Sequence, residues 1–385
     1  MSFFKEIASI LQYKYKVSKN EKDIIFYAEH EGYYPYFEGL IDQLTTIEKK
    51  SVCYITSDID DPVLTNKADL IHALYLNTLL PFFLAFVRCK VFVMTLTELD
   101  KYHLKRSTYP VHYVYIFHSL VSTHMAYKKG SFDNYDSILC TGAYQRKEIR
   151  VYEEQEQLKH KQLVKAGYYR LERIYKRYKN YEKKREEVTN KIILVAPSWG
   201  DDNILEACGE SLISLLLNNN YIVIVRPHPE TIRRSPALID MLIQKFGHNQ
   251  KCKFELSVST DDSLLQADAL ICDCSGIALE YAFGTERPVL FIDVPYKIKN
   301  PYYKKLGMEP FELSIRQKIG ILVSPDDIIS IPSVIETLLN ERNTFKREIV
   351  KLRKEHVYAF GESTSIVTKY ILDLLRQTER SLNNN

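Results

Sequence analysis

The chain has 385 residues, more than a single hydrophobic core usually supports, so we expect two domains. A formal charge of +3 excludes a strongly basic nucleic-acid binder, and ordinary apolar and charged fractions argue against a disordered or fibrous class. Seven scattered cysteines without metal-ligand spacing, and an N-terminus without the apolar core of a signal peptide, favour a cytoplasmic protein with reduced thiols.

The N-terminal half alternates strand-like and helix-like segments. We expect strands at residues 23–28, 51–56, 91–95, 111–117 and 137–141, and helices at 36–44 and 70–87. Repetition of strand, crossover helix and strand predicts a doubly wound parallel sheet. The apolar run at 79–87 contains Pro81 and is shorter than the roughly 20 residues that span a bilayer.

Residues 161–187 form a charged, helix-prone connector, in which most charges are positive: Lys165, Arg170, Arg173, Lys176, Arg177, Lys179, Lys183, Lys184 and Arg185. A solvated helix face is the simpler interpretation of this segment. The alternative is contact with an anionic membrane surface, which would make the protein peripheral on the inner face of the plasma membrane.

A second alternating series follows, with strands expected at 191–196, 221–225, 269–272 and 289–292, and helices at 204–217, 235–246 and 277–283. We therefore predict an α/β fold of two Rossmann-like lobes with parallel sheets, similar to the glycosyltransferase-B architecture, with the active site in the interlobe cleft. The lobes are expected at residues 1–178, on the acceptor side, and 179–385, on the nucleotide-donor side. The terminal helices could pack back on the first lobe.

Polar residues follow the predicted strands directly, where open α/β sheets bind their ligands. His118 and Ser119 follow one strand, Ser198 another, Arg226 and His228 a third, and Asp273 and Ser275 a fourth. Four such coincidences in one chain indicate a functional site.

The most specific local signal is Arg226-Pro227-His228-Pro229. Two prolines stiffen the backbone where the strand stops, so that Arg and His are held at the strand end. Arg offers forked donors to phosphate, and His can donate a proton near neutral pH. A rigid turn with a surface histidine is the structural alternative.

Asp273-Cys274-Ser275-Gly276 lies between an apolar strand and a helix, where backbone N–H groups and a hydroxyl can cradle an anion. Ordinary N-capping would explain the same residues. Glu280, one helical turn further, could reach a ribose or base, or could be a solvated residue. His118 is the candidate general base, although a lone histidine after a strand is more often structural.

Several other site types are absent from the sequence: there is no Walker loop, no Gly-x-Gly-x-x-Gly after a strand and no zinc spacing. We expect no metal site and no cofactor.

The order of motifs resembles the CDP-glycerol glycerophosphotransferase family, the teichoic-acid primase and polymerase group. The likeness covers roughly residues 27–375. The segment at 165–172, which contains Arg170, looks like the family's Gly-Tyr-Pro-Arg-Asn-Asp; residues 194–199 are similar to its Ala-Pro-Thr-Trp strand end; and Arg226-Pro227-His228-Pro229 matches outright. Residues 268–276 resemble its Asp-x-Leu-Ile-Thr-Asp-Tyr-Ser-Ser, and 287–291 fit the strand that follows.

This resemblance implies transfer of glycerol phosphate, or another polyol phosphate, from a CDP-activated donor to a glycan or lipid-linked acceptor, with CMP leaving. His118 would take the acceptor proton. His228, with Arg226, Ser198 and Ser275, would hold the donor phosphates; Asp273, Gly276 and Glu280 belong to the same nucleotide-binding set. Ser119 and Arg170 are expected on the acceptor side or in the cleft.

The chain departs from the family pattern at three of these positions. The family usually has Gly after its first-lobe His, where this chain has Ser119; its second cradle Ser is here Gly276; and its Asp-Tyr pair is Glu280-Tyr281. These departures leave two alternatives open: a CMP- or CDP-sugar glycosyltransferase of the sialyl or Kdo type, and a catalytically silent nucleotide-binding subunit of a capsule or wall assembly. Donor, acceptor and oligomeric state are left open.

Overall fold

The computed structural model describes residues 2–383, apart from 67, 98, 186–189 and 258–259. Within these residues the chain forms two compact units. The first comprises residues 1–118, 128–170 and 357–385, and the second comprises residues 119–127 and 171–356. The sequence suggested one division after residue 178; this residue lies on α6 (Tyr169–Glu182), which belongs to the second unit from Leu171 on.

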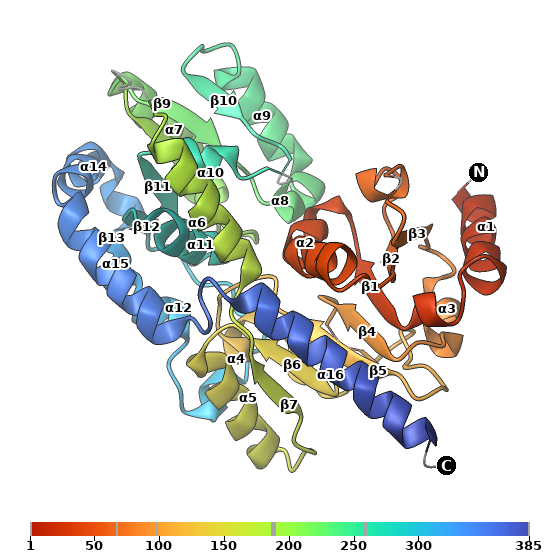
Figure 1. Cartoon of the computed structure of the whole chain (residues 1–385). Coiled ribbons are helices and arrows are strands. Elements are labelled where there is room, and N and C mark those ends of the chain that lie inside the picture. Colours follow the sequence, from red (N-terminus) through yellow and green to blue (C-terminus); the bar gives the residue numbers. More distant parts are fainter. Residues whose placement is uncertain (1, 67, 98, 186–189, 258–259, 384–385) are drawn as a thin grey trace. The chain divides into compact units, whose positions relative to one another are not determined.

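The first unit is built on a parallel sheet with strand order β3-β2-β1-β4-β5-β6-β7 (Figure 1). Its strands are β1 (Ile24–Ala28), β2 (Val52–Thr56), β3 (Ile71–Tyr75), β4 (Val91–Met94), β5 (His112–Ile116), β6 (Ser137–Cys140) and β7 (Gln162–Lys165). Its helices are α1 (Ser2–Tyr15), α2 (Tyr34–Asp42), α3 (Leu80–Phe86), α5 (Ala143–Gln155) and α16 (Ser363–Asn383).

The second unit has its own parallel sheet, with strand order β10-β9-β8-β11-β12-β13. Its strands are β8 (Ile192–Val195), β9 (Ile222–Val225), β10 (Cys252–Phe254), β11 (Ala269–Cys272), β12 (Val289–Ile292) and β13 (Gly320–Val323). The longer helices are α7 (Ile204–Asn218), α9 (Pro236–Phe246), α11 (Gly276–Thr285), α14 (Ile331–Asn340) and α15 (Arg342–His356). The short ones are α4 (Thr123–Ala126), α8 (Pro229–Arg234), α10 (Asp262–Gln266), α12 (Phe311–Ser314) and α13 (Arg316–Ile319).

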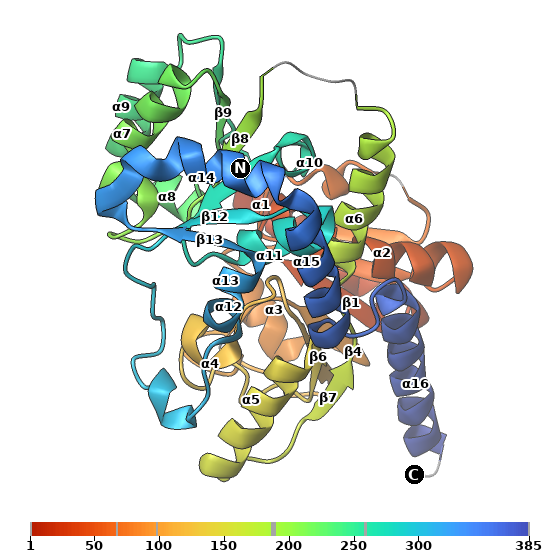
Figure 2. The ribbon, with the colours of Figure 1, turned by 90° about the vertical axis from the view of Figure 1, so that its left-hand side faces the viewer.

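The central strands are continuous apolar runs because helices cover both faces of each sheet. Every residue of β1, β2, β11 and β12 is buried. In the first unit Val367 and Ile371 of α16 join the core that Phe26 and Phe37 build. In the second unit α11, α13 and α15 lie side by side (Figure 2). The predicted α/β fold with two parallel-sheet lobes is therefore confirmed.

The expectation of one helix over residues 70–87 is wrong. Residues 71–75 form strand β3, which pairs with β2, and the helix begins only at Leu80. Pro81 stands in the first turn of α3, where a missing N–H costs nothing, so it starts this helix and does not interrupt a longer one. Strands β7, β10 and β13 were also not predicted. Like β3, each lies at the edge of its sheet.

Candidate functional site

The predicted donor-side residues lie in the second unit, at the carboxyl ends of three neighbouring strands. Strands β9, β8 and β11 are adjacent in the sheet and parallel, so the loops that follow them leave the same edge. Ser198 follows β8, Arg226 and His228 follow β9, and Asp273 to Gly276 follow β11. The structure thus brings these segments together, and their contact with a nucleotide donor stays a prediction.

His228 is the N-cap of α8, and its ring is held in a defined orientation. Its Nδ1 accepts a hydrogen bond from the Glu230 N–H at 3.1 Å. Because Nδ1 accepts, the proton of the neutral ring is on Nε2, which therefore serves as a donor. The Trp199 ring lies 6.1 Å from the His228 ring, centroid to centroid.

Arg226 is only 4% exposed, and its side chain is held by neighbours in the second unit. The guanidinium donates to Ser263 Oγ at 3.0 Å and lies 4.0 Å from the Glu255 carboxylate. These contacts favour a supporting role, in which Arg226 fixes the end of β9. Its predicted contact with a donor phosphate stays a prediction.

Asp273 connects two of the loops. Its buried Oδ1 accepts the N–H of Ser198 at 2.8 Å, which ties the loop after β8 to the loop after β11. Burial raises the pKa of Asp273, although hydrogen bonds from Ser198 and Ile204 oppose the shift. A buried carboxylate would repel a phosphate, so Asp273 is suited to positioning the Ser198 loop.

Ser275 is the N-cap of α11, and its side chain makes no capping hydrogen bond. The first N–H groups of a helix have no partner within the helix, so the start of α11 presents donors together with the Ser275 hydroxyl. Glu280 is 4% exposed, on a stretch of α11 where residues 278–285 are all buried. Its predicted contact with a ribose or base stays a prediction.

Ser119 and Gly276, two of the departures from the family pattern, lie against each other in the second unit. A Cβ added to Gly276 would lie 2.1 Å from Ser119 Oγ. The hydroxyl of Ser119 therefore occupies the space that a side chain at position 276 would need. The two departures compensate each other, because a hydroxyl remains next to the start of α11.

A cation-rich cluster around Trp199 was missed in the sequence. Lys297 lies over the face of the Trp199 ring, and the Arg234 guanidinium and the Lys299 ammonium lie 4.8 and 5.8 Å from its centroid. Among the residues that the structure describes, no carboxylate lies within ion-pair distance of Lys297. Burial, followed by repulsion from Lys299, lowers the pKa of Lys297 to about 6. We call Trp199, Arg234, Lys297 and Lys299 the Trp199 cluster; the only signal for it was the lone tryptophan next to Ser198.

His118 lies in the first unit, just after β5. The rings of Tyr33 and Tyr36 meet it edge-on, with centroids 5.6 and 6.3 Å away. Arg170 is buried and places its guanidinium 5.2 Å from the Tyr36 centroid, and Tyr168 lies on the same tyrosine. Tyr36, Tyr168 and Arg170 also line a small pocket of this unit, together with Phe117, Gly167 and Ser363. Arg170 thus positions the aromatic surroundings of His118.

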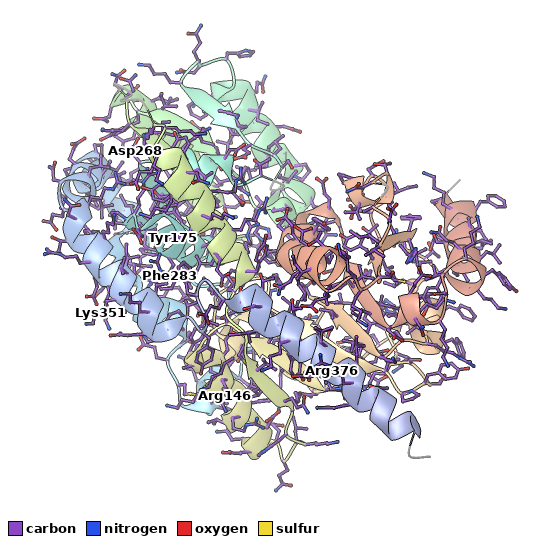
Figure 3. The ribbon with its side chains drawn as sticks, viewed as in Figure 1. Arg146, Tyr175, Asp268, Phe283, Lys351 and Arg376 are labelled. Carbon is purple, nitrogen blue, oxygen red and sulfur yellow. The ribbon has the colours of Figure 1, made fainter. Side chains whose placement is uncertain are left out.

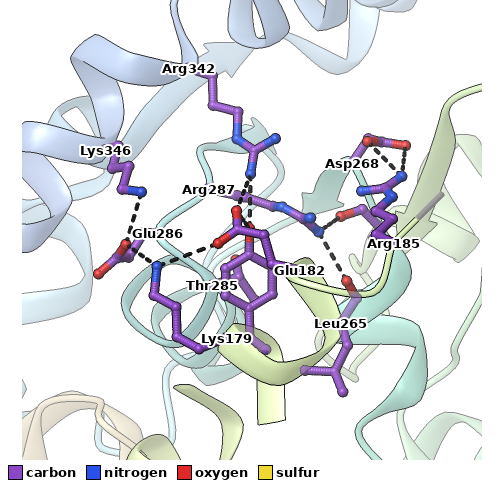
Figure 4. A network of polar contacts seen from close by, with 12 residues as sticks. Lys179, Glu182, Arg185, Leu265, Asp268, Thr285, Glu286, Arg287, Arg342 and Lys346 are labelled. Atoms are coloured by element: carbon purple, nitrogen blue, oxygen red, sulfur yellow. Dashed lines mark hydrogen bonds and ion pairs between the residues drawn. The ribbon is translucent and has the colours of Figure 1, made fainter. Parts of the chain in front are cut away.

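Four of the nine basic residues of the connector pair with acids of the second unit. Arg173 and Arg177 pair with Asp261. Figure 4 shows Lys179 paired with Glu286, and Arg185 paired with Asp268. Arg353 also links α6 to α11, because it lies over the ring of Tyr175 on α6 and donates to the carbonyl of Phe283 on α11. Tyr175 and Phe283 are marked in Figure 3. Lys176, Lys183 and Lys184 remain exposed.

Within the described part of the chain, no cluster of three or more His, Cys, Asp or Glu side chains could hold a metal ion. The same residues contain no helix that is both long and apolar enough to cross a bilayer.

A profile of the CDP-glycerol:poly(glycerophosphate) glycerophosphotransferase family matches residues 9–304, more than half of the chain. The chain belongs to this family. The family resemblance seen in the motifs is thereby confirmed, and the match includes His118, His228 and the Trp199 cluster. The family is one of transferases. No curated protein sequence matches the chain.

Two solved structures with a similar fold contain a uridine nucleotide. The UDP-GlcNAc 2-epimerase from Neisseria meningitidis bound to UDP-GlcNAc has 11% identity and a TM-score of 0.58, covering 91% of this chain and 100% of that one. The S. aureus MnaA–UDP structure has 12% identity and a TM-score of 0.56, covering 92% and 97%. At such identities the likeness shows the shared two-lobed fold alone.

Proposed function

We propose that the chain transfers glycerol phosphate, or a related polyol phosphate, from CDP-glycerol to an acceptor hydroxyl and releases CMP. The reaction would serve synthesis of a cell-surface polymer, teichoic-acid-like or capsular, on a glycan or lipid-linked acceptor. The observation that carries the proposal is the convergence of His228, the start of α11 and the Trp199 cluster at the carboxyl ends of β8, β9 and β11. A donor with two phosphates needs cations and hydrogen-bond donors of this kind.

In the proposed reaction the acceptor oxygen attacks the phosphorus that carries glycerol. A new P–O bond forms, the bond from this phosphorus to the bridging oxygen breaks, and CMP leaves with that oxygen. The acceptor hydroxyl gives its proton to His118. Transfer of this kind depends on placement and charge neutralisation more than on covalent help from the protein.

On the donor side, the charge that develops on the leaving CMP phosphate requires stabilisation. His228 can donate from Nε2, because its Nδ1 is already occupied by the Glu230 N–H. Lys297 adds a cation once a bound anion favours its charged form, and the α11 N-terminus adds backbone hydrogen-bond donors. Seven free cysteines fit the cytoplasmic setting that we propose with this function.

The test is CMP release from CDP-glycerol, CDP-ribitol, CMP-sialic acid and CMP-Kdo, with poly(glycerol phosphate) oligomers and a mixed glycan as acceptors. We expect release from CDP-glycerol. His118→Ala should lower turnover at least about 100-fold while CDP still binds, because proton transfer to a base is lost. Release from a CMP-sugar alone, or from no donor, would contradict the proposal.

The proposed hydrogen bond from His228 Nε2 to a phosphate is tested with the variant His228→Asn. Asparagine keeps an N-cap acceptor for α8 but has no Nε2 donor. We expect unchanged thermal stability and CDP binding weakened roughly tenfold, the loss of one charge-assisted hydrogen bond. His248→Ala, at an exposed histidine outside the site, is the matched control. Unchanged CDP affinity in His228→Asn would remove His228 from the phosphate site.

A further inference from the structure

Five ring side chains of the first unit form one connected row that includes the proposed base His118. The His30 ring lies 4.6 Å from the Tyr33 ring, centroid to centroid. Tyr33 in turn lies 5.6 Å from His118 and 6.0 Å from Tyr36. Tyr36 lies 6.2 Å from Tyr168, the last member. We call these five side chains the aromatic row; Tyr168 is buried, and the other four are at least partly exposed.

The aromatic row lies where the strand order of the first sheet reverses. Strands β2 and β3 extend the sheet on one side of β1, and β4 to β7 extend it on the other (Figure 1). Open α/β sheets bind ligands at the carboxyl ends of the strands on either side of such a reversal, here β1 and β4. His30 follows β1, Thr95 follows β4 directly, and His118 follows β5, the next strand. Tyr33 and Tyr36 come from the turn after β1 and from the start of α2.

The hydroxyl of Thr95 is buried at this edge of the sheet without a partner. Thr95 is 2% exposed, and within the described residues its Oγ1 makes no hydrogen bond. The register of β4 with its two neighbours brings Thr95 level with Ala28 of β1 and Ile116 of β5, which contribute to the same core. Residues two positions further along a strand return to the same face, so His30 and His118 continue the face on which Thr95 lies.

His30 offers a hydrogen-bond donor but little positive charge. Its Nδ1 accepts the N–H of Gly32 at 3.1 Å, so the proton of the neutral ring is on Nε2. Burial lowers the pKa of His30, and the nearby carboxylates of Asp58, Glu31 and Asp61 oppose this shift. These three acids would repel a phosphate bound at His30, whereas a neutral hydroxyl would not be repelled.

Aromatic rings combined with neutral hydrogen-bonding groups suit a sugar. One face of a pyranose consists of C–H groups, which pack on aromatic rings, and its rim consists of hydroxyls, which need hydrogen-bond partners. Tyr33 and Tyr36 supply rings, and His30 Nε2 and Thr95 Oγ1 supply partners. Tyr36 and Tyr168 also line the small pocket of this unit, so the row borders a concave surface. A glycerol phosphate unit has no ring face and carries a negative charge.

We propose that the aromatic row binds a neutral sugar, so that the hydroxyl that accepts glycerol phosphate belongs to a glycan. The sugar packs on Tyr33 and Tyr36 and places one hydroxyl at His118, while His30 and Thr95 bind others. The inference rests on the proposed function for the role of His118 as base. It narrows the acceptor to a sugar, because the acids around His30 oppose a polyol phosphate chain at this position.

The test is binding of methyl glycosides to the purified full chain, measured by saturation-transfer NMR with no nucleotide donor present. The probes are the methyl glycosides of glucose, mannose and N-acetylglucosamine, with glycerol phosphate as the anionic competitor. We expect at least one glycoside to bind with a Kd on the order of 1 mM. Glycerol phosphate should not displace it.

Three variants should each weaken glycoside binding at least about fivefold and leave CDP binding unchanged. Tyr33→Leu keeps an apolar side chain against the core but removes the ring. His30→Asn keeps an acceptor for the Gly32 N–H but has no Nε2 donor. Thr95→Val removes the hydroxyl, and its melting temperature should not fall, because an unpartnered buried hydroxyl adds no stability.

Tyr15→Leu and His160→Asn, at an exposed tyrosine and an exposed histidine of the same unit, are the matched controls and should bind as the unaltered protein does. Absence of glycoside binding, displacement by glycerol phosphate, or unchanged binding in any of the three variants would each overturn the inference. CMP release with a poly(glycerol phosphate) acceptor but no glycoside binding would overturn this inference alone. Glycoside binding without CMP release from any donor would contradict only the proposed reaction.

Discussion

At the scale of single residues, Gly276 is a tightly constrained position of the candidate site. Its missing side chain leaves room for Ser119 Oγ, 2.1 Å from where a Cβ would lie. We predict that Gly276→Ala lowers the free energy of unfolding by about 1 kcal/mol, because the Ser119 hydroxyl must turn to another rotamer to make room. In a Ser119→Gly background the same change should cost less. A double-mutant cycle followed by denaturant unfolding measures the difference.

The control for this cycle is Gly209→Ala, since a Cβ there would meet Leu205 at 3.3 Å, far less closely. Equal costs of Gly276→Ala in both backgrounds would show that the pair is not coupled. The exchange Ser119→Gly/Gly276→Ser should retain CDP affinity, because one hydroxyl stays beside the start of α11.

Lys297 gives the site a pH dependence. With its pKa lowered to about 6, the side chain is largely neutral at pH 8 without a ligand, and an anion favours its charged form. The basic residues around Lys297 are Lys299, Arg234 and His228, and the acidic residues are Glu230 and Asp273. Sulfate, which does not titrate in this range, should bind more tightly at pH 6 than at pH 8, by up to about tenfold per pH unit.

The fluorescence of Trp199, the one tryptophan of the chain, reports this binding directly. The variant Lys297→Met should bind sulfate more weakly. Its sulfate affinity should also depend less on pH, because only the other ionisable groups then contribute to the pH dependence. A pH slope in Lys297→Met equal to that of the unaltered protein would show that another group carries it.

At the scale of elements, helix α6 is fastened to α11 and α15 through one acid. Glu286, at the end of α11, accepts from Lys179 of α6 and from Lys346 of α15 (Figure 4). It also accepts from Arg353 of α15. Burial alone would raise the pKa of Glu286, but the hydrogen bonds from Arg353 and Lys179 lower it. This ion network accounts for Lys179 among the basic residues of the connector.

Replacing this acid should destabilise the second unit. Glu286→Gln leaves three cations without their carboxylate, one of them on the buried Arg353, and should cost on the order of 3 kcal/mol at pH 7. Because the folded pKa is lowered, this stabilisation is present above the ordinary value of 4.5 and is lost as pH falls below it. The difference between the unfolding free energies of the two proteins should therefore be smaller at pH 4 than at pH 7.

Glu210→Gln is the matched control for the Glu286 variant. Its pair with Lys245 is about half exposed on both sides, and such pairs contribute about 0–1 kcal/mol. A Glu286→Gln cost as small as that of the control would mean that the network does not stabilise the unit.

At the scale of the whole molecule, each unit draws on segments far apart in the chain. The first is completed by residues 357–385, and the second includes residues 119–127. Val367 and Ile371 of α16 are buried in the core of the first unit. Ser122 donates to Glu312 from both its N–H and its hydroxyl, which fixes the short inserted segment in the second unit. The expectation of an active site in an interlobe cleft stays a prediction.

The amino-acid sequence determined the central parts of both sheets and the loops that follow β8, β9 and β11. Strands such as β1 and β11 are covered on both faces, so they require unbroken apolar runs that can be recognised locally. The motif with His228 and the turn with Ser275 were recognisable for a similar reason, because prolines and a helix start leave a signature in neighbouring residues.

Only the tertiary structure decided the edge strands, the contacts of Lys297 and Ser119, and the orientation of α1. Each of these depends on residues that are distant in the chain. Edge strands such as β7 and β13 are partly exposed and lack a clear pattern, so pairing with a neighbouring strand defines them. Lys297 meets Trp199, and Ser119 meets Gly276, only after the strands between them are in register. The same holds for α1, whose outward apolar face follows from backbone groups elsewhere in the first unit that bind its polar residues.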